Sequence, residues 1–447
     1  MGTEKQYTDI YRNYSGAIRS SSSEVMNAAR EGAIEAFTRQ GFPTRKVERY
    51  RYTDIGPLFA PDYGLNINRL DIPIDPYDVF GCDVPNLSTS LYFVVNDALY
   101  TKALPVARLP EGVVIDSLKD YSSKNADLIG RYYSQIASPD GDAVTALNTF
   151  LAQDGLVVYV PDGVEVERAI QVINILRSDV DLMVNRRVLI ILGSRSKAKL
   201  LFCDDAADDR HFLTTQVVEV FVGEGASLDL YCLEETHSKN VRVSNVYVRQ
   251  EGWSKVNHNS ITLHNGITRN RLDLAMYGEG AECSLNGCVI ADKTQHVDNN
   301  TLIEHKVPNC TSNELYKYVL DGRSVGAFAG RMLVHEGAQK TVSTMRNQNL
   351  LATGEARIFT QPMLEIYADD VKCGHGSTTG QLNDAALFYM RQRGISLSEA
   401  KLILEQAFIN EVVDKMHLVP LRDRLHYLVE KRLTGELAKC RGCKLCK

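Results

Sequence analysis

The stretch QVVEVFVGEGASLDLYCL, residues 216–233, decides how the chain folds. Two short runs rich in valine and leucine flank a corner made of Gly223, Glu224, Gly225 and Ala226. Glycine permits the backbone angles that a tight corner needs, and a small residue fits on its inner side. The pattern therefore predicts two strands joined by a sharp turn.

The same corner recurs at Gly278–Ala281 and at His335–Ala338, each time between apolar runs. Residues 155–371 consist of one short apolar run after another, and none has helical periodicity. Such a series argues against an alternating βαβ fold and leaves a sandwich, barrel, propeller or solenoid. A recurring corner favours the solenoid, with the three corners a few coils apart.

The flanking regions have a different pattern. Residues 22–40 predict an amphipathic helix ended by Gly41, residues 91–99 a hairpin, and residues 143–153 a further helix. Helical periodicity returns at Asp384, and three helices are expected before residue 435. We therefore divide the chain into a mixed region (1–150), a β-solenoid (151–380), a helical region (381–435) and a cysteine-rich tail (436–447).

The composition is that of an ordinary globular protein, with 44% hydrophobic and 24% charged residues among 447 and a net charge of −6. The negative charge argues against the broad basic surface of a nucleic-acid-binding protein. No run nears the roughly 18 apolar residues of a membrane span, and residues 1–20 lack the apolar stretch of a secretory signal. We expect a cytoplasmic protein with neither nucleic-acid nor membrane partners.

Seven of the ten cysteines are scattered, which is not the pattern of a disulfide framework. In a reducing compartment each is expected to be a small buried side chain. They are Cys82, Cys203, Cys232, Cys283, Cys288, Cys310 and Cys373.

Motifs of common enzymes are missing from the sequence. There is no GxxxxGK[ST] phosphate loop, no HExxH and no GxSxG. The glycines of residues 278–287 are not followed by a helix, so they do not form a dinucleotide-binding turn. We therefore expect a protein that is not an enzyme on its own.

The densest group of polar side chains lies in EIYADDVKCGHGSTTG, residues 365–380. It brings Glu365, Asp369, Asp370, Cys373 and His375 within eleven residues. If this segment is extended, the thiol and the imidazole point to one face, because they are two residues apart. Together they would form half of a site for iron, zinc or an iron–sulfur cluster. Alternatively, the thiol is buried packing and the imidazole only hydrogen-bonds the carboxylates.

The segments LEIYADDVKCGHGSTTGQL (364–382) and ALFYMRQRGIS (386–396) resemble the SufB/SufD family of iron–sulfur cluster assembly proteins. The version with ADDVKC before HG is similar to the SufD branch, and residues 345–349 lack the cysteine that SufB proteins carry there. The resemblance continues through LNTFLAQDGLVVYVPDGVEVERAIQV (147–172). RYRYTDI (49–55) resembles the family's N-terminal motif, with Tyr50 where tryptophan is more usual.

This resemblance implies a right-handed parallel β-helix that pairs with a SufB-like subunit, or with itself when alone. It implies that the C-terminal helices bind a SufC-like ABC ATPase, whose closure rearranges the subunit interface where a cluster forms. His375 and Cys373 would face that interface, with iron or a cluster bound only transiently and no firmly held cofactor. Of the C-terminal apolar residues, some should cover the last coil of the solenoid and others should contact the ATPase. They are Leu387, Phe388, Ile395, Leu402 and Phe408.

The tail carries Cys440, Cys443 and Cys446 in a CxxCxxC pattern, which departs from the family. Three thiolates at this spacing can bind iron, zinc or a cluster, with a fourth ligand from elsewhere. Neighbouring lysines and arginine favour the thiolate form. The alternative is an unstructured, reactive tail.

Two other functions fit parts of the sequence. A β-helix carbohydrate-active enzyme would use carboxylates such as those of Asp273, Asp292 or Asp298, but the chain has a single tryptophan and no secretory signal. A SufB-like cluster-building scaffold would use Cys283, Cys288 or Cys310 as ligands.

Overall fold

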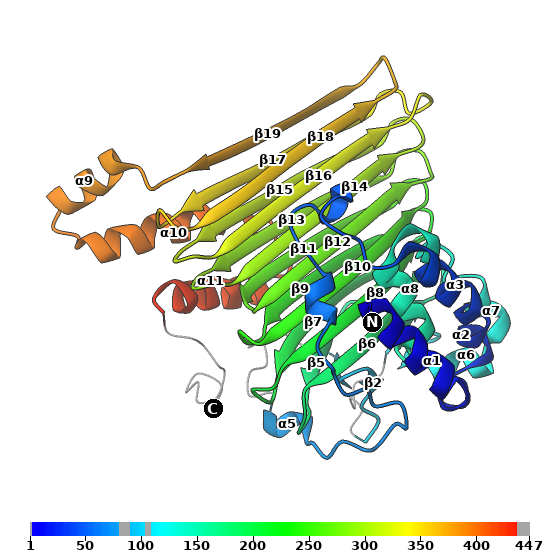
Figure 1. Ribbon diagram of the computed structural model, residues 1–447. Coiled ribbons are helices and arrows are strands. Elements are labelled where there is room, and N and C mark those ends of the chain that lie inside the picture. The colour runs from blue at the N-terminus through cyan, green and yellow to red at the C-terminus, as the bar shows by residue number, and fades with distance from the viewer. Residues whose placement is uncertain (1, 80–89, 103–108, 436–447) are drawn as a thin grey trace.

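The computed structural model describes residues 2–79, 90–102 and 109–435. Two sheets wind together into a β-solenoid in which, from β4 onward, each strand pairs with the strand two places further along the chain (Figure 1). Sheet A contains β3 (Val114–Ser117), β4 (Leu156–Val160), β6 (Leu182–Leu192), β8 (Phe212–Val222), β10 (Asn240–Gln250), β12 (Ile267–Met276), β14 (His296–His305), β16 (Val325–Val334) and β18 (Arg357–Ile366). Sheet B contains β1 (Ser90–Val95), β2 (Ala98–Leu99), β5 (Ile170–Leu176), β7 (Lys197–Ala206), β9 (Ser227–Glu235), β11 (Lys255–His264), β13 (Glu282–Ala291), β15 (Thr311–Leu320), β17 (Val342–Leu351) and β19 (Lys372–Gly380).

The corners are built as the sequence predicts. Ala226, Ala281 and Ala338 are completely buried, while Gly225 and Gly280 have φ of 67° and 72°. The three corners join β8 to β9, β12 to β13 and β16 to β17, so successive ones lie two coils apart. The pairing of β4–β19 is parallel throughout. The expected parallel β-solenoid is therefore confirmed.

The N-terminal region covers the outer face of sheet A at its first coils, except that Tyr77 packs against Phe93 of sheet B (Figure 1). Its helices are α1 (Thr3–Ser20), α2 (Glu24–Ala28), α3 (Arg30–Gln40), α4 (Gly56–Phe59), α5 (Pro76–Val79), α6 (Leu118–Lys124), α7 (Ala126–Gly130) and α8 (Ala143–Leu151). The expected helix at 22–40 is two helices, broken at Ala29. The break precedes Arg30, whose buried guanidinium donates to the carbonyl oxygens of Phe150 and Ala152 and so fixes the start of α3. The hairpin of β1 and β2 is confirmed.

The C-terminal helices are α9 (Asp384–Gln392), α10 (Leu397–Val413) and α11 (Val419–Leu433). Ser396 accepts a hydrogen bond from the Glu399 N–H at the start of α10, and Pro420 lies in the first turn of α11. Helices α10 and α11 pack on the outer face of sheet B through an apolar cluster. Among its members are Ile261, Leu263, Ile290, Leu315, Val319, Ile409, Val412, Val413, Leu421 and Leu425.

The expectation that these helices cover the last coil is wrong. They contact β11, β13 and β15 on the flank, because the outward side chains of those strands form an apolar face that must be shielded from water. In the part of the chain that the structure describes, β18 pairs only with β16, and β19 pairs only with β17. The last coil therefore leaves one open edge on each sheet.

Among residues 2–79, 90–102 and 109–435, no helix combines the length and apolar character that crossing a membrane requires.

Candidate functional site

Cys373 and His375 lie on β19, the last strand of sheet B, and pair in register with Ser343 and Met345 of β17. Cys373 packs against the apolar core inside the solenoid, which identifies its side of β19 as the inner face. His375 shares that face, because alternate residues of a strand point the same way. Cys373 and His375 therefore lie on the same face of β19, as the sequence predicts. They lie at the open end of the solenoid formed by β18 and β19, which we call the mouth.

The inward-facing side of β19 also carries hydroxyl groups beyond His375. The Ser377 hydroxyl is hydrogen-bonded to Thr360 of β18, at 2.7 Å, and it donates to Oδ1 of Asn347. This contact joins the two sheets across the mouth and holds β19 against the coil behind it. It fixes the strand on which the thiol and the imidazole lie.

The two side chains differ in their surroundings. Cys373 is half-buried and His375 is exposed. Partial burial raises the pKa of the Cys373 thiol, although the Ser343 backbone N–H opposes the shift. At neutral pH the thiol therefore keeps its proton. The pair offers one sulfur and one nitrogen donor, which suits a soft or borderline metal.

The predicted group of five polar residues is not assembled, so the assumption that residues 365–375 are extended is wrong. A corner at residues 367–371 separates β18 from β19. Glu365 points to the outer face of sheet A, where it forms an ion pair with Arg331. Asp370 lies in the corner, where its backbone N–H donates to the Gln339 side chain. Among the described residues, no three His, Cys, Asp or Glu side chains are placed to hold a metal ion.

The three cysteines named for a SufB-like role do not all face one site. Cys283 packs in the core inside the solenoid, whereas Cys288 faces outward beneath the C-terminal helices. The thiol of Cys310 donates to the carbonyl oxygens of Gly278 and Pro308 at a corner. This arrangement argues against a site that uses all three thiols.

The carboxylates proposed for a carbohydrate-active enzyme are each held by other side chains. Asp273 pairs with Arg49 and Arg271, and Asp292 pairs with Arg432. Asp298 accepts a hydrogen bond from the Thr53 hydroxyl at 2.6 Å. These contacts are structural and give no support to that alternative.

Four of the cysteines lie outside the described residues: Cys82, Cys440, Cys443 and Cys446. The proposed metal site in the tail therefore stays a prediction.

The predicted partner-binding residues of the C-terminal helices divide into two groups. Phe388 is 65% exposed, whereas Leu387 is buried and Ile395 and Leu402 are half-buried. The Phe408 ring of α10 packs against the apolar cluster on sheet B, with the Lys317 ammonium 4.3 Å from its centre, so it stabilises the docking of α10. On α9 and α10, sequence reasoning missed three further exposed apolar side chains, Tyr389, Leu397 and Ile403. Figure 1 shows α9 projecting away from the end of β19.

The segment 45–55 has a role that sequence reasoning also missed. It crosses the outer face of sheet A and reaches the last coil (Figure 1). Tyr52 stacks on Phe359 with ring centres 5.0 Å apart, and its hydroxyl donates to Gln361 of β18. Tyr50 lies against the guanidinium of Arg269, 3.8 Å from the ring centre. The segment thus fastens the N-terminal region to the open end of the solenoid.

Comparison with known proteins covers both main parts of the fold. Residues 1–172 match the family model of the SufBD protein N-terminal region, and residues 175–408 match the SufBD core domain of SUF-system FeS cluster assembly. The chain is 24% identical to an iron–sulfur cluster assembly SufBD family protein of Synechocystis, with 93% of each covered. It is 26% identical to the iron–sulfur cluster assembly protein SufD of Escherichia coli, over 90% of this chain and 92% of that protein. A SufBD family protein of Mycobacterium leprae is 32% identical over 48% of this chain and 57% of its own length.

Proposed function

Because the chain belongs to the SufBD family of iron–sulfur cluster assembly proteins, we propose that it is a SufD-type scaffold subunit. In this role it pairs with a SufB-like subunit through its last coil and carries a SufC-like ATPase on its C-terminal helices. It is not an enzyme by itself, and iron or a nascent cluster is its cargo. The observation that carries the proposal is the open last coil, with Cys373 and His375 at its mouth.

The open coil is a surface that needs a partner. Unpaired strand edges present a row of backbone N–H and C=O groups, and folded proteins usually cover or blunt them. On β19 every residue except Cys373 is exposed, and the outer face of β18 presents Phe359. A second solenoid placed edge to edge would satisfy the backbone groups of both sheets. The same edge explains how the chain could pair with itself when no partner is present.

Pairing would also complete the metal-binding chemistry. One thiol and one imidazole provide two donors, whereas an iron centre in a cluster has four. The remaining donors would come from the partner across the joint or from the assembling cluster. Because ligand thiols must lose their protons, cargo binding at Cys373 releases a proton and is favoured by higher pH.

The ATPase would dock on α9 and the exposed side of α10. Phe388 and Tyr389 are 65% and 60% exposed on α9, and Leu397 and Ile403 add apolar surface on α10. Aromatic side chains at an exposed surface often act as the main contacts of an interface. The sequence has no phosphate loop of its own, so the energy of ATP has to come from such a partner.

Co-expression with SufB-like and SufC-like proteins tests this function. Affinity purification of this chain should recover both partners, and Phe388→Ser with Tyr389→Ser should lose only the ATPase. Val419→Ser is the matched control, because Val419 is also an exposed apolar residue, at the start of α11. A chain that recovers neither partner would refute the proposal.

The role of the mouth is tested separately in the recovered complex. His375→Ala should lower the yield of reconstituted cluster without changing the recovered subunits. His211→Ala serves as the control, since His211 is an exposed histidine just before β8. Equal cluster yield from the two variants would remove His375 from the mechanism while leaving the pairing intact.

A further inference from the structure

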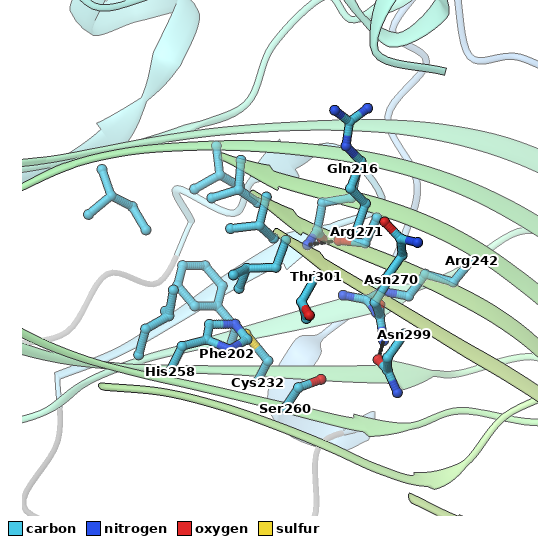
Figure 2. A pocket seen from close by; sticks show the side chains of 18 of the residues that line it. Phe202, Gln216, Cys232, Arg242, His258, Ser260, Asn270, Arg271, Asn299 and Thr301 are labelled. Atoms are coloured by element: carbon cyan, nitrogen blue, oxygen red, sulfur yellow. Dashed lines mark hydrogen bonds between the residues drawn. The ribbon is translucent and has the colours of Figure 1, made fainter. Parts of the chain in front are cut away.

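A small chamber lies inside the solenoid, several coils behind the mouth (Figure 2). Its volume is about 40 Å³, and its walls come from both sheets. Apolar side chains of sheet A, including Val188, Val218, Val246 and Leu272, line one side. Since a buried water needs roughly 10–15 Å³ of such space, the chamber has room for about three waters or one small molecule.

Polar groups converge on this chamber from both sheets. The Cys232 sulfur lies 3.9 Å from Nε2 of His258, and the two side chains are adjacent in Figure 2. On the other side, Arg242 donates to Oδ1 of Asn270 at 2.8 Å. Nδ1 of His258 is buried and has no hydrogen-bond partner among the described residues. Buried polar groups of this kind are normally satisfied by water or by a ligand.

The charges beside the chamber are not balanced when Glu234 is protonated. Asp204 lies between two buried guanidinium groups, 2.6 Å from Nη1 of Arg186 and 3.2 Å from Nε of Arg242. The Glu234 carboxyl is 3.9 Å from Nη1 of Arg242, and burial raises its pKa to about 7. With that carboxyl neutral, two guanidinium groups share one carboxylate. A positive charge without a counter-charge is costly to bury, and a bound anion would relieve this cost.

We propose that the chamber binds a small, weakly hydrated anion beside Arg242, with hydroxyl donors from Ser244 and Ser260. Both serines line the chamber together with the guanidinium. The largely apolar wall selects a weakly hydrated anion, because it cannot replace the water that a strongly hydrated anion such as fluoride or sulfate would lose. This inference does not depend on the proposed function.

Binding should be coupled to the protonation of Glu234. The groups that face this carboxyl are Arg242 of β10, Asp204 of β7 and the hydroxyls of Thr262 and Thr268, which donate to it. Its carboxyl is protonated below about pH 7 and ionised above. The anion and the carboxylate compete for the same guanidinium charge, so anion affinity is highest below pH 7 and falls as pH rises.

The imidazole and the thiol of the chamber stay neutral over this range, and Arg271, which also lines it, stays charged and paired with Asp142 and Asp273. Burial lowers the pKa of His258 to about 4 and raises the pKa of Cys232 to about 12. The thiol and the imidazole are therefore both uncharged between pH 6 and 8. Glu314, which accepts a hydrogen bond from the chamber residue Thr301, also has its pKa raised to about 7. The part of the pH dependence that Glu234→Gln removes is therefore the part assigned to Glu234.

Iodide is a suitable probe, and thermal unfolding of the full chain is the first readout. Iodide replaces fluoride at constant total halide, so that ionic strength stays fixed. As a general salt effect, iodide should lower the unfolding midpoint relative to fluoride. Binding in the chamber should instead raise the midpoint in a saturable way at pH 6. At pH 8 the half-saturating iodide concentration should be about tenfold higher.

Two variants separate the chamber from other sites. Glu234→Gln keeps the side chain at position 234 uncharged, so its iodide affinity should fall much less between pH 6 and pH 8 than that of the unaltered protein. Cys232→Met fills the chamber and should abolish the stabilisation. Crystals grown with iodide should show its anomalous signal between Ser244, Ser260 and Cys232. A midpoint that iodide only lowers, equal stabilisation of Cys232→Met, or an anomalous signal confined to the surface would each overturn the proposal.

Discussion

Glu314→Gln should stabilise the protein at high pH and leave its stability unchanged at low pH. Glu314 lies on the inner face of β15, where Oε1 accepts a hydrogen bond from Thr301 at 2.7 Å. Its Oε2 is buried without a partner in the described part of the chain. Burial raises the pKa of this carboxyl from 4.5 to about 7, because its charged form has lost water and gained no cation.

The size of the effect follows from that pKa. In the unfolded chain the carboxyl ionises near pH 4.5, and in the folded protein near pH 7. The native state therefore holds the proton more tightly, and the stability that this proton gives is lost as pH rises from 4.5 to 7. The difference of about 2.5 pKa units corresponds to roughly 3 kcal/mol, at about 1.4 kcal/mol per unit. Glutamine mimics the protonated acid, so the free energy of unfolding of the variant does not fall in this way as pH rises.

Urea unfolding at pH 5 and at pH 8 measures the prediction. The free energy of unfolding of Glu314→Gln should match that of the unaltered protein within about 1 kcal/mol at pH 5 and exceed it by about 2–3 kcal/mol at pH 8. Comparing the two proteins at each pH cancels the titration of all other groups, including the buried histidines His258 and His305. A difference that is the same at both pH values would refute the reasoning, because it would mean that Glu314 titrates alike in both states.

Three further substitutions test other parts of the structure. Glu219→Ala leaves the completely buried guanidinium of Arg187 without its carboxylate and should cost about 3–5 kcal/mol in urea unfolding; a cost below 1 kcal/mol would contradict the burial of the pair. Tyr52→Ala removes the stacking on Phe359 and should cost only about 1 kcal/mol while speeding hydrogen exchange in β18; unchanged exchange in β18 would show that segment 45–55 does not hold the last coil. Ile409→Ala should cost about 2–5 kcal/mol, since this side chain is completely buried between α10 and sheet B, and a neutral result would mean that α10 is not docked there.

The sequence was sufficient to predict the solenoid because its evidence is local and repeated. Each corner needs a small inner residue, and the alanines at 226, 281 and 338 occupy that position. The pairing of Cys373 with His375 could also be predicted, since alternate residues on a strand share a face whatever surrounds the strand.

Other features depend on contacts between residues far apart in sequence and could not be predicted this way. The corner at 367–371 sends Glu365 to the opposite side of the solenoid from His375, although only ten positions separate them. The docking of α10 on sheet B depends on the outward side chains of β11, β13 and β15, which periodicity alone does not assign to a partner. The contact of Tyr52 with Phe359 spans more than 300 positions and leaves no local signal.

Hydrogen exchange of the chain alone and in complex with a SufB-like partner tests the central claim most directly. Backbone amides of β18 and β19 that face the open edges should exchange at least about tenfold more slowly in the complex, because they gain hydrogen-bond acceptors across the joint. Amides of the corner at residues 251–254 should be unaffected. Protection confined to other surfaces, with β18 and β19 exchanging as fast as before, would contradict the claim that the open coil is where the two subunits join.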